Sequence, residues 1–398
     1  MSAAGYDAVI AGGGASGLSL AAALAVHGWR DRAVLLVDDA DARPAAVCWA
    51  YWSARSGPLD AAVSRRFRRI RVHADGRGAV VPLDPYEYRV VRHADLRRVV
   101  TGVLDRCPGF AVASGRVREI RDGPHAAEVV VDGRVVPARW VFDSVSPWPA
   151  TGPPDARLAF TGWEVDCANS VFDPAVPTLF DFRVPQADAA RFVYVLPDGP
   201  HRALVELTEF VPRHGRPSAP ADRVAALARY VSTVLNAGDY EIRRTESAVL
   251  PLRARRPSRR TGHVLAIGAR GGLVKGSTGY AYERIQRDST AIARSLVRHG
   301  HPFDLPRRAR RHGLLDAVLL DVLDRDPLQL ERAFARLFLD NPADRVLRFL
   351  DEDSTSGDEA RLIASMPKAP YVRAVAARAH AATLRRVEGP VGWVRKVR

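Results

Sequence analysis

Three glycines near the start of the chain have the spacing of a dinucleotide-binding turn. Gly12, Gly14 and Gly17 follow the apolar residues 6–11 and precede an Ala- and Leu-rich stretch, which gives the order strand, glycine turn, helix. Gly12 permits a tight turn, Gly14 lets a pyrophosphate approach the backbone, and Gly17 lets the helix pack closely on the strand. The phosphates would then lie at the helix N-terminus, where unpaired N–H groups and the dipole favour negative charge. The pattern predicts nucleotide binding.

An acidic residue follows the next apolar stretch where a ribose contact is expected. Residues 33–37 are apolar and end at Asp38 and Asp39, about 20 residues after the glycine turn. We expect Asp38 to bind the ribose hydroxyls. The uncharged run between Asp7 and Arg30 could be mistaken for a membrane span, but its glycines and the lack of a basic flank argue against a span or a signal peptide.

The size and cysteine content set further limits. A chain of 398 residues exceeds one ordinary core, so two or more domains are expected. The cysteines Cys48, Cys107 and Cys167 are scattered and odd in number. This favours a reducing compartment over a disulfide framework or a zinc site, so we expect no metal. No targeting segment is visible, which makes the cytoplasm the expected location.

The formal net charge is +14, with nearly all of the excess supplied by arginine. Such a charge can mark a nucleic-acid or anionic-membrane partner. No nucleic-acid recognition motif is present, so nucleic acid is not expected. A solvated basic surface and attraction to an anionic membrane both remain open.

The order of elements along the chain predicts the domain organisation. Residues 126–136 are typical of a hairpin around Asp132-Gly133, and a proline cluster at 147–154 marks a boundary. Alternating apolar residues between 160 and 252 predict an antiparallel sheet with one helix over 221–236, and the apolar spacing after residue 312 predicts helices.

A second strand, glycine turn and helix begins at residue 264. It carries Gly268, Gly272, Thr278 and Gly279, which we expect to contribute to the same nucleotide site. This layout is that of two-domain α/β flavoproteins, with a Rossmann-like FAD-binding domain, an inserted antiparallel-sheet substrate domain and a helical C-terminal region. The expected parts are residues 1–155 and 259–300 for the FAD-binding domain, 156–258 for the substrate domain and 301–398 for the helical region.

Several segments of the chain resemble a known family, the lycopene cyclases, and most closely the bacterial lycopene β-cyclases. The resemblance spans nearly the whole chain in the right order, and it is carried by residues 179–186, 192–197, 202–210, 268–272, 277–280, 286–287, 336–338 and 345–350. It implies a redox-neutral reaction that requires reduced FAD, with NAD(P)H as reductant. The linear ψ-ends of lycopene, or of a similar polyene, would become β-ionone rings by proton addition, carbocation ring closure and proton loss.

Glu206 is the expected acid–base residue, because it occupies the first acidic place of the family's motif. On a regular strand it shares a face with Thr208 and Phe210, whereas Glu209 lies on the other face. Apolar neighbours would raise the pKa of Glu206 and prepare it to give a proton. Many family members carry a second acid where this chain has Leu207, and Glu209 should point the wrong way to replace it.

The resemblance also suggests residues that contact the substrate. Asp181 matches the family's aspartate and is expected either to hold a neighbouring arginine or to line the cavity. Trp49 occupies the place of a family tryptophan, and Tyr194, Thr208 and Phe210 complete the expected substrate site. Their aromatic rings could face the cation.

Three other interpretations stay open. The first is an FAD-dependent monooxygenase, although flavin hydroxylases have Gly-Asp where this chain has Gly268-Ala269. The second is a cyclase of another prenylated natural product, and the third is a non-catalytic flavoprotein that binds a carotenoid or a membrane. We expect peripheral contact with the inner membrane face, because a polyene must be drawn from the bilayer. The helix after Tyr280 would direct its positive end at the flavin and favour the anionic reduced form.

Overall fold

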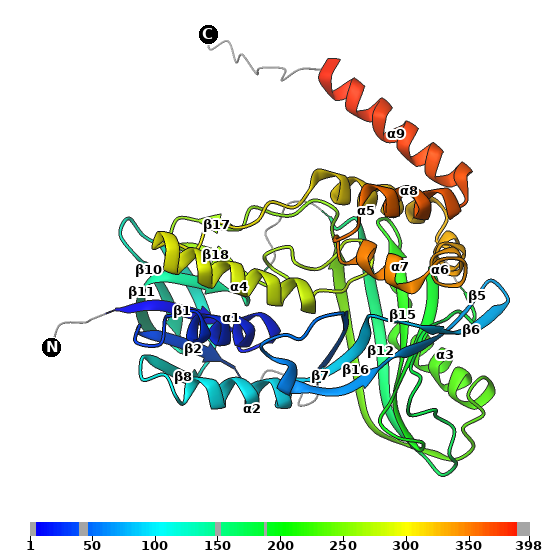
Figure 1. The fold of residues 1–398 in the computed structure, drawn as a ribbon, viewed down its shortest axis with the longest axis horizontal. Helices are drawn as coiled ribbons and strands as arrows, with labels where there is room; N and C mark the ends of the chain where they lie inside the picture. The colour runs from blue at the N-terminus through cyan, green and yellow to red at the C-terminus, as the bar shows by residue number, and fades with distance from the viewer. Residues whose placement is uncertain (1–4, 40–46, 148–152, 187–188, 388–398) are drawn as a thin grey trace, which may run out of the picture.

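The first glycine turn connects the centre of a large sheet to a buried helix. The computed structural model describes residues 5–39, 47–147, 153–186 and 189–387 (Figure 1). In this sheet β1 pairs in parallel with both β2 and β11, as expected for a nucleotide-binding fold. The strand order is β17-β18-β11-β1-β2-β8, and β10 and β9 extend it through β11. The strands are β1 (Tyr6–Ala11), β2 (Val34–Asp38), β8 (Phe110–Ser114), β9 (Val117–Asp122), β10 (Ala127–Val131), β11 (Arg134–Asp143), β17 (Arg260–Thr261) and β18 (Val264–Ala266).

Helices α1 (Ala15–Val26), α2 (His93–Leu104) and α4 (Tyr282–His299) pack together on this sheet. The residues of α1 are almost all buried, because the helix lies between its two neighbours and the strands. Helix α4 ends at Gly300, whose left-handed conformation (φ of 69°) forms the C-cap. The predicted hairpin is confirmed as β10 and β11 around a turn at Asp132 and Gly133.

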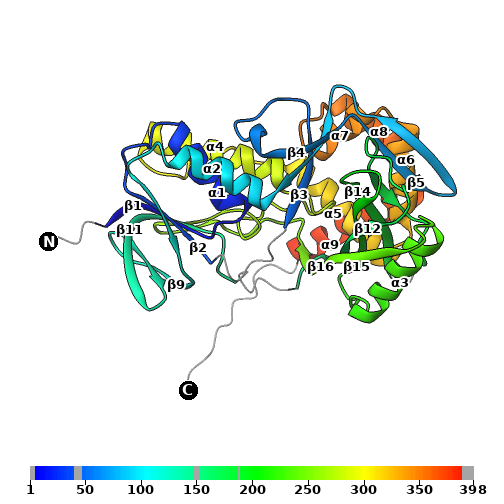
Figure 2. The ribbon, with the colours of Figure 1, turned by 90° about the horizontal axis from the view of Figure 1, so that it is seen from below.

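A second sheet of seven strands has the order β16-β12-β15-β14-β13-β5-β6. Its pairs are antiparallel except β13 with β5. Helix α3 (Pro220–Thr233) covers one face, and the C-terminal helices cover the other (Figures 1 and 2). The strands are β5 (Arg69–Ala74), β6 (Arg77–Pro82), β12 (Ala156–Cys167), β13 (Thr178–Asp181), β14 (Ala190–Pro197), β15 (Arg202–Pro212) and β16 (Tyr240–Leu252).

Strands β5 and β6 differ from the sequence prediction, which placed all of residues 1–155 with the FAD-binding domain. Both strands belong to the seven-stranded sheet and form its edge, rather than joining the sheet that contains β1. The strands that flank β5 and β6 in the chain form a short separate sheet in the order β3-β7-β4. Its strands are β3 (Cys48–Ser53), β4 (Val63–Phe67) and β7 (Glu87–Arg92). The 3-10 turn Asp60–Ala62 precedes β4. Local alternation predicts a strand but does not state which sheet the strand joins.

The predicted helical region after residue 312 is confirmed. It consists of α5 (Arg310–Arg325), α6 (Gln329–Asp340), α7 (Ala343–Leu350), α8 (Ser356–Ser365) and α9 (Lys368–Val387). Thr355 and Asp358 form a reciprocal capping box that begins α8. Helix α6 packs Leu330, Phe334 and Phe338 against the aromatic face of the seven-stranded sheet, whereas α9 contacts α5 and extends away from the body of the molecule (Figure 1).

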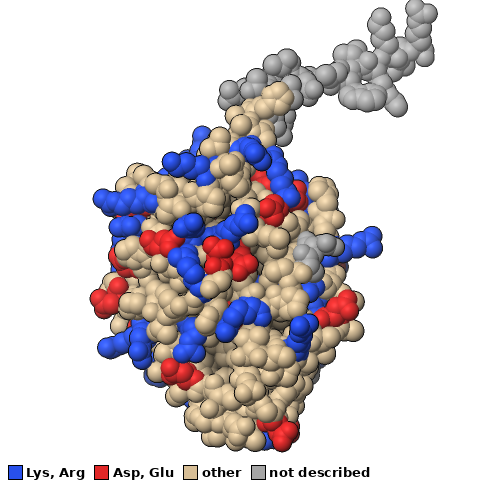
Figure 3. Space-filling view, turned by 90° about the vertical axis from the view of Figure 1, so that its right-hand side faces the viewer, with Lys and Arg blue, Asp and Glu red and all other residues tan. Residues whose placement is uncertain are grey.

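The surface carries both signs of charge. On the face shown in Figure 3, Lys and Arg side chains alternate with Asp and Glu. Among the described residues, no helix combines the length and the hydropathy that a bilayer span requires.

Candidate active site

The first glycine turn forms a narrow cradle at the start of α1. A Cβ on Gly17 would lie 1.8 Å from the carbonyl oxygen of Gly12, so only glycine permits this close approach of helix and strand. Gly12 has a φ of 105°, which favours glycine. Gly14 is the N-cap residue of α1. The backbone N–H groups of the first helical turn are therefore available to an anion.

Asp38 lies at the end of β2, as the sequence predicted, and its carboxylate is buried against the turn. Its Oδ1 accepts a hydrogen bond from the backbone N–H of Gly13 at 3.1 Å. Its Oδ2 pairs with the guanidinium of Arg97 at 2.7 Å. His93, at the start of α2, lies 3.1 Å from the Gly13 carbonyl oxygen. The carboxylate is thus held in place beside the glycine cradle.

The second glycine element meets the first at Gly268. A Cβ at this position would lie 2.5 Å from the Ser16 hydroxyl oxygen in α1, and the φ of Gly268 is 60°. Gly272 and Gly279 also have positive φ values. Gly279 approaches Leu158 of the seven-stranded sheet, and Thr278 lines a cavity on that sheet. The element therefore runs from the first glycine turn to the seven-stranded sheet, and α4 begins directly after it.

Glu206 lies on β15 and faces the cavity side of the sheet, opposite α3. Its cross-strand neighbour is Tyr194, and Thr208 donates a hydrogen bond to Glu206 Oε1 at 3.1 Å. Desolvation raises the pKa of Glu206 above its usual range, and the nearby Glu246 raises it further. The predicted register of this strand is confirmed: Val205 and Leu207 pack towards α3, whereas Phe210 packs in the aromatic core on the other face.

Glu246 is the second carboxyl group of the site, and the sequence analysis did not identify it. It lies on β16, and the central strand β12 places one residue, Gly162, opposite both Glu206 and Glu246. Directly opposed residues of an antiparallel pair point to the same face, so both glutamates face the cavity. Burial also raises the pKa of Glu246, although Arg244 acts in the opposite direction. Only the register of three strands, which a local pattern does not contain, could have indicated this pair.

Aromatic side chains lie on the cavity side of the sheet, and Tyr194 and Tyr280 are near Glu206. The Tyr280 hydroxyl lies 3.5 Å from that of Tyr194 and 3.4 Å from that of Tyr88. The ring of Trp52 lies 4.4 Å from the ring of Tyr280, and its indole N–H donates to Asp351 at 2.8 Å. Tyr280, directly before α4, therefore connects the second glycine element to the carboxyl groups.

Two hollows adjoin this site. An apolar cavity is lined by Leu158, Phe180, Phe192, Tyr194, Phe210, Ser277, Thr278, Tyr280, Leu330 and Phe334. A cleft of about 140 Å³ has Cys48, Leu204, Glu164 and Arg244 among its lining residues. Burial, with added repulsion from Glu246 and Glu206, raises the pKa of the Cys48 thiol to about 12. The carboxyl pair thus lies close to the wall of the cleft.

The structure places Trp49 apart from the other residues that were expected at the substrate. It was expected at the substrate, but alternation along β3 places it on the face of the FAD-binding domain, beside His93 and stacked on Tyr282. Cys48 and Trp52 lie on the opposite face, towards Glu206. Trp52, and not Trp49, therefore lies on the face of β3 that is turned towards Glu206.

Asp181 also lies outside the two hollows described above. Its carboxylate is buried, pairs with Arg183 at 2.7 Å and accepts a hydrogen bond from the Tyr230 hydroxyl at 2.7 Å. Tyr230 belongs to α3, on the far face of the sheet. Of the two expected roles, the structure therefore favours the ion pair with the neighbouring arginine over contact with substrate.

Glu209 points away from the cavity, as predicted. Its Oε1 accepts hydrogen bonds from the Arg191 guanidinium at 3.1 and 3.2 Å, and both side chains are buried. Ser218 donates two further hydrogen bonds to the same carboxylate. Glu209 is therefore a structural residue on the α3 side.

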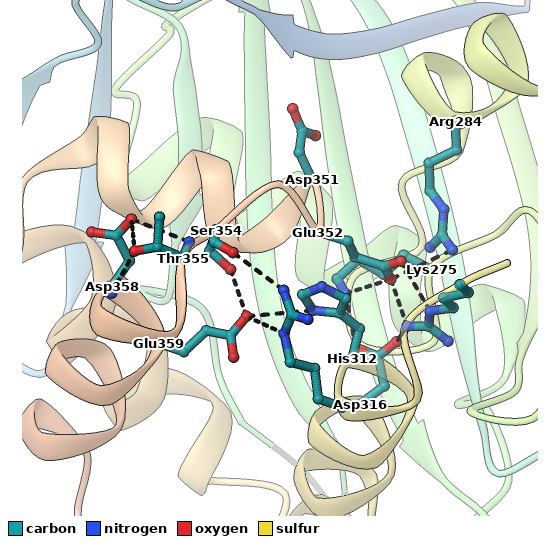
Figure 4. A network of polar contacts seen from close by, with 12 residues as sticks. Lys275, Arg284, His312, Asp316, Asp351, Glu352, Ser354, Thr355, Asp358 and Glu359 are labelled. Carbon is teal, nitrogen blue, oxygen red and sulfur yellow. Dashed lines mark hydrogen bonds and ion pairs between the residues drawn. The ribbon is translucent and has the colours of Figure 1, made fainter. Parts of the chain in front are cut away.

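A buried ionic network joins the second glycine element to the C-terminal helices (Figure 4). The Lys275 ammonium donates to Asp316 at 2.9 Å and to Glu352 at 3.2 Å. Arg308 pairs with both carboxylates, and Arg284 of α4 lies 3.5 Å from Glu352. Burial alone would raise the pKa of Glu352, but Lys275 and Arg284 outweigh burial and lower it to about 2. The network holds the element that carries Tyr280 against the helical region.

Comparisons with known proteins agree with this architecture. A family model described as "Lycopene cyclase protein" matches residues 7–376. No curated protein sequence matches the chain significantly. Solved structures with a similar fold include the flavin-dependent brominase Bmp2, with a TM-score of 0.61 and 14% identity over 95% of this chain and 99% of that one. A geranylgeranyl bacteriochlorophyll reductase-like protein from Thermoplasma acidophilum has a TM-score of 0.57 and 11% identity, with 93% and 96% covered. The Diels-Alderase PyrE3 has a TM-score of 0.55 and 18% identity, with 88% and 80% covered.

Proposed function

Because the chain belongs to the lycopene cyclase family, we propose that it is an FAD-dependent enzyme that cyclises the linear ends of lycopene or a similar polyene. The reaction involves no net oxidation or reduction. The observation that carries this proposal is the environment of Glu206: a carboxyl group with a raised pKa faces an aromatic cavity where the second glycine element meets the substrate sheet.

The residues present fit an FAD molecule. Gly12, Gly14 and Gly17 would admit the pyrophosphate to the start of α1, Asp38 would bind the ribose, and Gly268 closes the second element onto the first. When bound in its reduced form, with NAD(P)H as the reductant, FAD would supply negative charge near the substrate end.

Different side chains would then donate the proton, stabilise the cation and exclude water during a proton-initiated cyclisation. The Thr208 hydroxyl holds Glu206 Oε1, so the acidic proton resides on Oε2. This proton adds to the terminal alkene of the substrate, whose π electrons form the new C–H bond. The cation closes onto an internal alkene, and loss of a ring proton leaves a new double bond. The faces of Trp52, Tyr194, Tyr280 and Phe210 would stabilise the cation, and the apolar walls would exclude water that could capture it.

We also propose that the enzyme acts at the inner face of the membrane as a peripheral protein. A polyene substrate dissolves in the bilayer, and the net charge of +14 favours anionic lipid. Contact by charge and apolar side chains requires no spanning helix.

One anaerobic experiment tests the reaction. The purified protein is incubated with chemically reduced FAD and lycopene, and the products are separated and weighed by mass spectrometry. Cyclisation gives a product with the mass of lycopene and fewer conjugated double bonds. An oxygenated product, formed only in air with NAD(P)H, would indicate a monooxygenase instead. Unchanged lycopene that co-purifies with the protein would indicate a binding protein, and turnover of a different prenylated compound would redefine the substrate.

A further inference from the structure

We propose that Glu246 is the proton partner of Glu206, so that the two carboxyl groups hold one proton between them. This inference rests on the proposed function for its role in the reaction, but its physical core concerns only the two side chains. Glu246 supplies a second acid from a different strand, because this chain has Leu207 where many family members carry that acid.

The first support is the strand geometry. Strands β15 and β16 are both hydrogen-bonded to β12, so they lie two strand spacings apart, about 9.5 Å. A side chain on the strand between them would separate the glutamates. That position is Gly162, and a Cβ there would lie 3.1 Å from both Cγ and Oε1 of Glu246. The absent side chain opens the path along which the two carboxyl groups come within hydrogen-bonding reach.

The second support is the asymmetry of the two environments. Burial and the nearby Glu164 raise the pKa of Glu246, but Arg244 at 3.9 Å and the hydrogen bond with Glu206 favour its ionised form. Among the described residues, the polar neighbours of Glu206 besides Glu246 are neutral: Thr208 on β15, Tyr194 on β14, Tyr280 before α4 and the Cys48 thiol on β3. The proton therefore resides on Glu206, which donates to a charged Glu246. The negative charge of Glu246 disfavours ionisation of Glu206.

The third support is access to solvent. Arg244 also pairs with Glu164 at 3.4 Å, and both line the cleft beside Cys48. The side chain of Glu246 is 18% exposed and lies 3.9 Å from Arg244, which lines the cleft, so Glu246 can exchange protons with solvent. Glu246 acts through Glu206 and is a positioning residue: its charge keeps Glu206 protonated, and the shared hydrogen bond restores the proton after each cycle.

The pair gives one proton to the substrate and receives one proton back, so the reaction consumes no protons. Glu206 gives one proton to the terminal alkene, and the two carboxylates then face one substrate cation. The ring carbon releases one proton, whose C–H electrons form the new double bond, and that proton returns to the pair. No oxidant or reductant is consumed.

The decisive measurement is the titration of the buried carboxyl group by difference infrared spectroscopy of the full-length protein. In the wild type, a protonated-carboxyl C=O band is expected at neutral pH, and it should be absent in Glu206→Gln. In Glu246→Gln the same band should be lost at a lower pH than in the wild type, by on the order of one pH unit, because the amide removes a like charge and can donate to the ionised form. Gly162→Ala, which places a methyl group 3.1 Å from Cγ and Oε1 of Glu246, should displace the Glu246 side chain and shift the band in the same direction.

Glu241→Gln is the matched control, because Glu241 lies on the same strand and is exposed next to Arg243. It should titrate like the wild type. An unshifted band in Glu246→Gln would overturn the proton pair, whatever the activity. A shifted band without cyclisation of lycopene would leave the pair standing and refute the proposed function instead. If Glu246→Gln fails to fold, Gly162→Ala provides the same spectroscopic comparison.

Discussion

Gly268 lies directly against Ser16, so the two glycine elements meet although these residues are 252 positions apart in the chain. A Cβ at position 268 would lie 2.5 Å from the serine hydroxyl oxygen, and the φ of 60° also favours glycine. This contact joins the glycine turn near the N-terminus to the segment that carries Tyr280 to the cavity beside Tyr194. One short segment therefore connects the first glycine turn to the aromatic cavity.

The first prediction concerns the glycine cradle. Gly14→Val should abolish FAD retention, because its side chain would occupy the position expected for the pyrophosphate. The measurement is the flavin absorbance per mole of folded protein after gel filtration. Gly102→Ala is a suitable control, because Gly102 lies in α2 and a Cβ there would meet nothing within 4 Å. A Gly14→Val protein with stoichiometric FAD would contradict the assignment of the turn.

The second prediction concerns the activity of Glu206. Glu206→Gln keeps the shape and hydrogen-bonding capacity of the side chain but removes its acidic proton, so FAD content should survive. Turnover should fall by about 100-fold or more, the usual scale for a lost general acid. Initial rates of ring formation with reduced FAD measure the effect. Full activity of Glu206→Gln would show that another group is the acid.

The third prediction is the pH dependence of stability at the same residue. The folded-state pKa of Glu206 lies above its ordinary value of 4.5, so the folded protein holds a proton that the unfolded chain has lost. The stability of the wild type therefore falls as the pH rises from 4.5 towards the raised pKa. Glu206→Gln should unfold at a higher temperature than the wild type, with a difference that grows over this range. Thermal unfolding at several pH values tests the sign, and a difference independent of pH would argue against a raised pKa.

The fourth prediction concerns Glu209, which the sequence and the structure both place on the face of β15 away from the cavity. The structure shows that this residue matters for stability. Glu209→Gln leaves the buried Arg191 without its carboxylate, and breaking a buried ion pair in this way costs about 3–5 kcal/mol. Urea unfolding should show the loss, while activity per folded molecule should persist because Glu209 faces α3. Glu119→Gln, which removes an exposed pair with Arg121, should have no measurable effect on stability.

The fifth prediction concerns the network around Lys275. Because Glu352 has a pKa lowered to about 2, its pairing stabilises the fold above the ordinary value of 4.5 and is lost as the pH falls from 4.5 towards 2. Lys275→Met should therefore lower the unfolding temperature strongly at neutral pH and less at acid pH. Lys368→Met, at the exposed start of α9, is the control. Equal effects of the two substitutions would contradict the importance of the network.

Membrane association is tested separately, with vesicles of anionic and of neutral lipid. Sedimentation with anionic vesicles should weaken as salt rises, because salt screens the attraction of a net charge of +14. Equal binding to both vesicle types at all salt concentrations would refute the electrostatic part of this proposal.

The sequence by itself determined the features that depend on local order. The spacing of Gly12, Gly14 and Gly17 predicts the nucleotide turn, the acid at the end of a strand locates Asp38, and alternation along residues 202–212 places Glu206 and Glu209 on opposite faces. Each of these follows from the period of a strand or the geometry of a turn, which neighbouring residues specify.

Only the tertiary structure decided which distant residues meet. Glu246 became the partner of Glu206 through the register of two strands on either side of Gly162. Trp52 rather than Trp49 faces the site because β3 turns one of its two faces towards the substrate sheet. Register and docking are set by the packing of whole layers, and a shift of one residue would exchange the two faces. A local pattern therefore predicts that a strand has two faces, but the assembled core decides what each face contacts.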